Sequence, residues 1–271
     1  MRDLRNIYKE IPDLKKVGKA YNKEHIKART TKKGYKVLMG SKSSKWTTFK
    51  KDFTAYTKNR CAICEREITQ YDDIEHYRPK NKEMYWWLAF DYRNYYICCK
   101  LCNTTYKGKE FPLLDPSKRV TFKTKAKIKE EKPLLFNPLK DNPLDLFKLE
   151  IYDRIPEPNG ESPQLKIVPK SKDKDSYEYQ KAATTIQVFN LNNDSKIDEK
   201  GNFISDGART QTMIILGTDL RNFLRIYKRF KQNKAKEEEL KEASKDLKDK
   251  GLDHLLKFIL TGQYKYIMPT K

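Results

Sequence analysis

The sequence predicts an α+β protein in which helices surround a small core of β-strands and one short helix, stapled by zinc. Two Cys-x-x-Cys pairs with a long gap between them indicate the metal staple. Helical periodicity from about residue 176 onward indicates a mostly helical carboxyl-terminal region. Two strands and a short helix bury little apolar surface, so we expect the metal to hold the core together.

The chain is strongly basic. Its 58 Lys and Arg residues outnumber its 37 Asp and Glu residues, which gives a net charge of +21 over 271 residues. Such a surplus either stays solvated or is matched by a polyanion, most often nucleic acid. No apolar run approaches the ~20 residues that span a bilayer, and the first residues do not resemble a secretory signal. Composition therefore excludes a membrane protein and predicts a cytoplasmic one.

Residues 1–45 are expected to form a basic amino-terminal arm, because they hold 14 basic but only 4 acidic residues. Apolar positions are sparse there, and helix-breaking residues predict short helical pieces joined by extended chain. The helix-breaking residues are Pro12, Gly18, Gly34 and Gly40.

Residues 46–125 are expected to form the core that carries the chemistry. This segment opens with aromatic side chains three or four residues apart, the pattern of one face of an amphipathic helix. All five cysteines follow this helix, within residues 61–102. The aromatic face consists of Trp46, Phe49, Phe53 and Tyr56.

Residues 126–271 are expected to be irregular at first and helical afterwards. Proline, aspartate and asparagine are frequent up to about residue 175, and short strands are expected there, such as one at 164–168. Of four predicted helices, the second has an apolar stripe and the third is so charged that we expect it to be solvated. The predicted helices are 176–189, 208–232, 235–249 and 252–261.

The cysteines predict a zinc site. Cys61 and Cys64 form one pair, and Cys99 and Cys102 form the second. A gap of two residues lets both thiolates of a pair reach one tetrahedral ion, so two pairs supply a complete ligand set. Cys98 would take the place of Cys99 only at a less usual spacing, and we interpret it as a buried strand residue.

A second group of polar residues lies between and beside the cysteine pairs. Glu75 and His76 adjoin at an expected strand end, Asn94 follows an aromatic stretch, and Asn103 follows the last cysteine. Neutral imidazole is a good general base near pH 7, and carboxylate and amide oxygens suit Mg²⁺, which stabilises a phosphate undergoing attack. An isolated His or loop Asn is usually structural, but the order of these residues favours phosphodiester hydrolysis.

In that order the residues resemble the zinc-containing HNH (ββα-metal, or His-Me finger) endonucleases. More narrowly they resemble the PtuB family, the HNH effectors of Septu and related retron anti-phage systems. The match covers about residues 46–140 and is patchy beyond them. It includes the two cysteine pairs, Glu75 to Lys80, Tyr85 to Ala89, Asn94, Asn103, Lys107-Gly108, Phe111 to Leu113, Pro133 to Pro138 and Phe189 to Asn192.

The resemblance implies a role for each matching residue. His76 corresponds to the general base, and Glu75 to the metal-binding acid before it, where many HNH enzymes have Asp or His. Asn94 corresponds to the residue that holds the histidine loop, the chain that directly follows His76, through backbone hydrogen bonds. Asn103 corresponds to a ligand of the catalytic Mg²⁺ or Mn²⁺. The four cysteines of the two pairs correspond to the structural zinc ligands.

The resemblance also implies partners. DNA is the expected substrate, with Arg78, Lys80 and Lys107 as phosphate contacts, although a solvated role suits the two lysines nearly as well. PtuB-like nucleases work with PtuA, an ABC-type ATPase, and this sequence has no phosphate-binding GxxxxGK[ST] loop of its own. The helical part of 126–271 would dock that ATPase, or would form a second core. The alternatives are an RNA (tRNA) nuclease and a non-catalytic zinc-ribbon binding or docking subunit.

Overall fold

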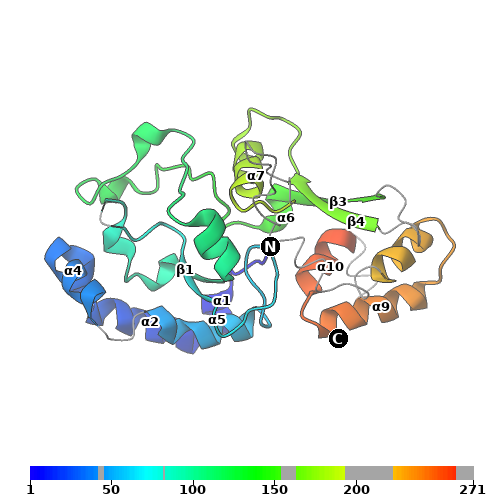
Figure 1. The fold of residues 1–271 in the computed structure, drawn as a ribbon, viewed down its shortest axis with the longest axis horizontal. Helices are drawn as coiled ribbons and strands as arrows, with labels where there is room; N and C mark the ends of the chain where they lie inside the picture. Colours follow the sequence, from blue (N-terminus) through cyan, green and yellow to red (C-terminus); the bar gives the residue numbers. More distant parts are fainter. Residues whose placement is uncertain (42–45, 82, 154–162, 193–221, 261–271) are drawn as a thin grey trace, which may run out of the picture.

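Figure 1 shows the computed structural model of the chain, which describes residues 1–41, 46–81, 83–153, 163–192 and 222–260. It combines many helices with two small antiparallel sheets, so the predicted mixture of helices and short strands is confirmed. Among the described helices, none is both long and apolar enough to cross a membrane.

The first sheet pairs β1 (Asp73–His76) with β2 (Tyr95–Cys98). All four residues of β2 are buried, and His76, the last residue of β1, lies opposite Tyr95. A short π-helical segment, η4 (Leu101–Lys107), follows β2 and ends at Gly108, whose φ of +47° suits glycine. Glu75, His76, Cys102 and Asn103 therefore lie on one compact strand–strand–helix unit, whereas Cys61 and Cys64 precede it in the chain.

The amino-terminal segment differs from the expectation. Residues 7–40 form a series of short helices, as expected, but the extended stretches expected between such pieces do not occur within 7–40. Pro12 starts a helix, because the missing N–H is not needed in a first turn. Gly18 is buried against the ring of Tyr92, so it permits close packing and does not break the helix. The helices are α1 (Ile7–Glu10), α2 (Pro12–Glu24), α3 (Ile26–Thr30) and α4 (Lys32–Gly40).

These helices run along one edge of the molecule in Figure 1 and end at α4. Their buried side chains recur every seven residues, which is two helical turns, and they pack against the aromatic core. The predicted amphipathic helix follows as η1 (Trp46–Phe49) and α5 (Lys50–Tyr56), with Phe49 and Phe53 fully buried. The seven-residue series is Leu14, Tyr21, Ala28 and Tyr35.

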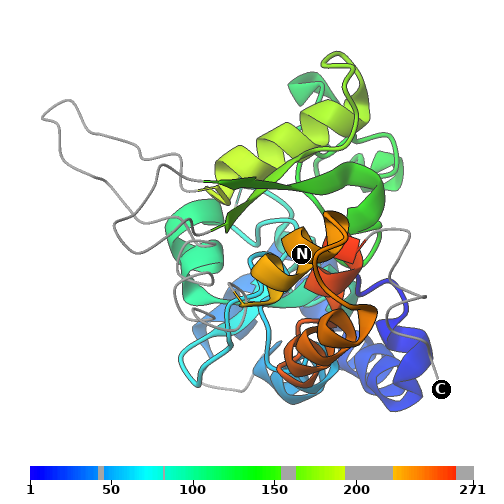
Figure 2. The ribbon, with the colours of Figure 1, turned by 90° about the vertical axis from the view of Figure 1, so that its right-hand side faces the viewer.

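Between β1 and the second sheet the chain is irregular, as expected. Apart from β2 and η4, its described residues form only short helical turns, which are η2 (Trp86–Leu88), η3 (Tyr92–Asn94), η5 (Pro116–Lys118), η6 (Lys125–Lys127) and α6 (Pro143–Leu146). The second sheet pairs β3 (Phe147–Asp153) with β4 (Pro163–Pro169), which confirms the strand expected at 164–168. Helix α7 (Tyr177–Val188), predicted at 176–189, lies along this two-stranded ribbon (Figure 2).

The carboxyl-terminal helices form a second apolar cluster. Two of them, α9 (Glu237–Asp249) and α10 (Asp253–Leu260), match the helices predicted at 235–249 and 252–261. Of the helix predicted at 208–232, only the last part is described, and residues 222–231 are helical. The solvated reading of α9 was wrong, because Leu240 and Leu247 form a buried stripe among the charges.

Candidate active site and metal centre

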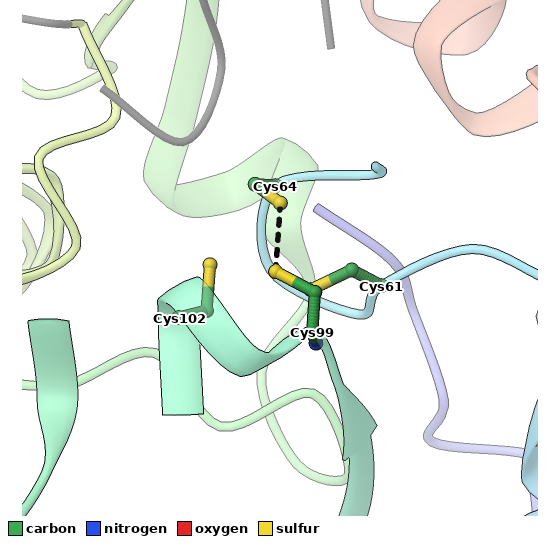
Figure 3. A group of neighbouring side chains, drawn as sticks. All are labelled: Cys61, Cys64, Cys99 and Cys102. Carbon is green, nitrogen blue, oxygen red and sulfur yellow. Dashed lines mark hydrogen bonds between the residues drawn. The ribbon is translucent and has the colours of Figure 1, made fainter. Parts of the chain in front are cut away.

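Four cysteine side chains converge on one point (Figure 3). Cys61 and Cys64 lie in the turn that precedes β1, whereas Cys99 and Cys102 lie just after β2 and within η4. The four sulfur atoms all lie within 4.8 Å of one another, and all four residues are buried. Sulfur atoms about 2.3 Å from a tetrahedral zinc ion would be about 3.8 Å apart. The Cys64–Cys99 separation of 3.6 Å agrees, so this set could hold zinc as its spacing predicts.

A buried carboxylate braces the two cysteine pairs against each other. Asp72 accepts hydrogen bonds from the backbone N–H of Thr69 (2.7 Å) and of Lys100 (2.6 Å), and from the guanidinium of Arg66 (3.1 Å). Arg66 and Thr69 follow the first cysteine pair, and Lys100 lies between the two cysteines of the second pair. Asp72 therefore fixes the spacing of the two pairs independently of any ion.

Cys98 lies outside the four-cysteine set. It is the last residue of β2 and is fully buried, as expected for a strand residue. Its Sγ nevertheless lies 3.8 Å from the Sγ of Cys61.

A pocket of about 200 Å³ lies beside this centre, between α4, the chain that follows β1, and η4. It brings together four of the residues singled out in the sequence, Glu75, His76, Lys80 and Asn103, and Asn94 does not line it. Met39, Pro79, Asn81, Gly108 and Lys109 complete the lining.

The imidazole of His76 is buried and oriented. Its Nε2 lies 2.9 Å from the carbonyl oxygen of Ala89, and because a carbonyl only accepts, Nε2 carries the proton. Nδ1 therefore keeps its lone pair and lies 3.5 Å from Nζ of Lys80. The rings of Trp46 and Tyr95 pack against the imidazole with centroids 4.7 and 4.9 Å away. Burial, reinforced by the charge of Lys80, holds the pKa of His76 well below its usual value, so the ring is neutral at pH 7.

Glu75 is paired with a buried lysine. Nζ of Lys107 lies 2.5 Å from Oε1 of Glu75 and also donates to the carbonyl oxygen of His76 at 3.0 Å. Burial raises the pKa of Glu75, and the charge of Lys107 opposes that rise. The only carboxylate of the pocket is therefore already matched by a cation.

Asn94 clamps the chain that leaves β1. Its Oδ1 accepts from the backbone N–H of Arg78 at 2.8 Å, and its Nδ2 donates to the carbonyl oxygens of Arg78 at 2.9 Å and Leu88 at 3.3 Å. Its own carbonyl accepts from the N–H of Tyr77 at 2.8 Å. These contacts hold the residues just after His76 without reaching the pocket.

Asn103 is presented to the pocket by η4, the same segment that carries Cys102. Its backbone N–H donates to the carbonyl oxygen of Cys99 at 2.9 Å. The position of its side chain is therefore coupled to the cysteine centre.

Arg78 and Lys107 do not lie where a phosphate would meet them. The guanidinium of Arg78 donates to Oε2 of Glu131 at 2.9 and 3.1 Å, and both residues are buried. Glu131 also accepts from the hydroxyl of Tyr85 and the N–H of Val120, each at 2.8 Å. Arg78 thus ties the histidine loop to the irregular chain around Glu131. Lys107 is buried beside Glu75. Of the three expected phosphate contacts, only Lys80 lines the pocket.

The sequence reasoning missed Glu131, Lys109 and Met39. Glu131 lies in the run Lys129-Glu130-Glu131-Lys132, whose composition is that of a solvated surface, so no local signal marks it. The pocket positions of Lys109 and Met39 depend on contacts across the fold.

The donor atoms of the pocket fit a magnesium ion that keeps most of its ligands as water. Mg²⁺ is usually held by one or two protein oxygens together with waters and substrate phosphates. Glu75 and Asn103 offer this small number of oxygens. Within the described part of the chain, the four cysteines are the only group of three or more His, Cys, Asp or Glu residues placed to share an ion.

Comparison with known proteins finds the Septu protein PtuB of Bacillus mycoides (strain KBAB4), which is 34% identical over 139 residues. The match covers 41% of this chain and 45% of that protein, so it spans less than half of the relative's length. The resemblance to PtuB expected from the motifs is thereby confirmed. No family model matches the chain. No solved structure matches it either.

Proposed function

Starting from its similarity to a Septu PtuB protein, we propose that this chain is the nuclease component of an anti-phage defence system. It would hydrolyse phosphodiester bonds of DNA by the metal-dependent HNH mechanism. The observation that carries the proposal is the pocket that joins an oriented, neutral His76 to the oxygen donors of Glu75 and Asn103. A zinc-ribbon binding module would have no use for that arrangement.

In this proposal Nδ1 of His76 accepts the proton. Because Nε2 is committed to the carbonyl of Ala89, Nδ1 is the ring atom able to take a proton from a water molecule in the pocket. The imidazolium that forms would gain stabilisation from the carbonyl of Ala89. Lys80, 3.5 Å from Nδ1, opposes early protonation and keeps the base ready at neutral pH.

Glu75 and Asn103 would hold the catalytic cation, which when bound would stabilise the charge on the attacked phosphate and on the leaving oxygen. Lys107 fixes the carboxylate of Glu75 while it neutralises much of its charge. The phosphate of the substrate would therefore supply part of the negative charge that the cation needs. Asn94 acts as a positioning residue, because its hydrogen bonds hold the backbone that follows His76.

The partner is proposed to be a PtuA-like ABC-type ATPase in a separate chain. Its docking surface would be the carboxyl-terminal helices, most of whose buried side chains form an apolar cluster of their own. These helices meet the rest of the protein through Phe258, which is part of the main core, and through polar contacts. In these contacts Arg2 donates to the carbonyl oxygen of Gly251 and Arg60 to that of Lys250. Because Arg60 directly precedes Cys61, its hydrogen bond would connect the docking helices to the first cysteine pair.

The test is cleavage of supercoiled plasmid DNA in Mg²⁺ by the purified chain, alone and with the ATPase, with a transfer RNA as a parallel substrate. Wild type is expected to nick or linearise the plasmid, and His76→Ala to lose this activity while keeping zinc. His254→Gln, which changes a histidine outside the pocket, is the matched control for the chain assayed alone and should there cleave like wild type. Equal cleavage by wild type and His76→Ala would contradict the assignment of the base. Cleavage of RNA alone would replace DNA as the substrate, and no cleavage with the ATPase present would favour a docking subunit.

A further inference from the structure

Helix α4 forms one wall of the pocket, and its position relative to the histidine loop is fixed. Met39 in its last turn lines the pocket. The buried hydroxyl of Tyr35 donates to the carbonyl oxygen of Lys80 at 2.6 Å, and its ring packs near Trp86 with centroids 6.0 Å apart. The backbone of α4 is therefore held in place beside the pocket.

Two lysines share the face of α4 that carries Met39. Lys36 lies three residues before Met39, and Lys32 lies four residues before Lys36, so the three side chains follow one another along the helix. Both lysines are exposed, and neither forms an ion pair with any residue in the described part of the chain. They continue the positive charge of the pocket outward along α4.

The opposite side of the pocket carries a third exposed cation. Gly108 ends η4 with a φ of +47°, and Lys109 follows directly and lines the pocket. Because Lys109 comes after the second cysteine pair and α4 precedes the first, the fold brings cations from two distant segments to either side of Glu75, His76 and Asn103. No carboxylate other than Glu75 lines the pocket to offset them.

We propose that α4 and the Gly108–Lys109 turn are the two sides of a phosphate channel, in which Lys32, Lys36 and Lys109 contact the nucleic-acid backbone on either side of the bond to be cut. This inference rests on the proposed function and assigns it a substrate path. These three lysines take the place of Arg78 and Lys107, which are buried. Each contact releases counterions and fixes the position of the backbone without reading bases.

The test is the salt dependence of binding to a short DNA duplex, measured in a His76→Ala background so that the duplex stays intact. The triple variant Lys32→Gln, Lys36→Gln, Lys109→Gln should reduce the slope of log K against log salt concentration by about 0.9 per lysine, or about 2.7 in all. The matched control is Lys172→Gln, Lys174→Gln, Lys234→Gln, which removes the same charge from exposed lysines away from the pocket and should leave most of that slope.

A charge-conserving triple variant to Arg at the same positions should bind like the parent, which separates loss of contact from loss of fold. A slope that is unchanged, or changed equally by the control, would overturn the channel. Cleavage by the wild-type chain is scored separately. A reduced slope without any cleavage would support the channel and contradict the nuclease, whereas cleavage with an unchanged slope would contradict the channel alone.

Discussion

Replacing Asn94 by alanine tests the clamp on the histidine loop. The side chain makes hydrogen bonds of 2.8 and 2.9 Å to the N–H and carbonyl of Arg78, and a longer one of 3.3 Å to Leu88. Asn94→Ala would leave the backbone N–H and the carbonyl oxygen of Arg78 buried without their hydrogen bonds to this side chain. At about 1–2 kcal/mol for each such group, we expect the free energy of unfolding to fall by about 2–4 kcal/mol.

The same change should be visible at His76. A loosened loop would admit water to the imidazole, whose low pKa comes mainly from burial, so the pKa of His76 should rise toward its usual value. Urea unfolding at saturating zinc measures the stability. NMR titration measures the pKa, and with only three histidines in the chain the His76 signal is identified by comparison with His76→Ala.

Asn137→Ala is the matched control, because Asn137 is similarly buried and its side chain accepts one hydrogen bond, from the N–H of Leu139 at 3.0 Å. It should cost about 1 kcal/mol and leave the pKa of His76 unchanged. The reasoning would be refuted if Asn94→Ala cost less than about 1 kcal/mol and the His76 titration did not move.

Three further predictions follow from the buried charges and thiols. Cys102→Ala should abolish stoichiometric zinc, measured by elemental analysis, and unfold the core, whereas Cys98→Ala should retain zinc; equal zinc loss in both would contradict the ligand set. Burial lowers the pKa of His254 to about 4, so the unfolded state binds a proton that the folded state does not. The contribution of neutral His254 to stability is therefore complete above about pH 6.5 and is lost as the pH falls toward 4, at up to about 1.4 kcal/mol per pH unit. His254→Gln should flatten the pH dependence of urea unfolding by that amount. An unchanged pH dependence would contradict the burial of a neutral His254. Glu131→Gln leaves a buried guanidinium without its counter-charge and should cost about 3–5 kcal/mol, whereas Glu150→Gln, at an exposed pair, should cost less than about 1 kcal/mol; similar losses would refute the buried network.

The parts of the site that were predictable from sequence are those set by local spacing. The gap of two residues within each cysteine pair places two thiolates together whatever the surrounding fold, and the structure brings the two pairs to one point. The strand end at His76 was likewise signalled by the nearby Pro79, and β1 ends at His76.

The parts that were not predictable depend on partners far away in the sequence. Glu131 pairs with a residue 53 positions away, and nothing in its charged surroundings distinguishes it from a solvated glutamate. Gly18 looked like a helix breaker because its close packing partner, Tyr92, is visible only in the fold. The buried role of Lys107 was hidden for the same reason, since its partner Glu75 lies across the strand–helix unit.

Chemical rescue of His76→Gly tests the central claim most directly. The glycine variant leaves a space between the rings of Trp46 and Tyr95 that matches the missing imidazole. Cleavage of plasmid DNA in Mg²⁺ should be lost in His76→Gly and partly restored by added imidazole. Glu75→Gln, which keeps His76 but removes the carboxylate charge, should be impaired and gain nothing from imidazole.

If His76→Gly cleaved at the wild-type rate without imidazole, His76 would not be the general base. Equal stimulation of both variants by imidazole would also contradict the account, because it would show that the added base does not act in the place of His76. Restoration confined to His76→Gly is the result that the account predicts.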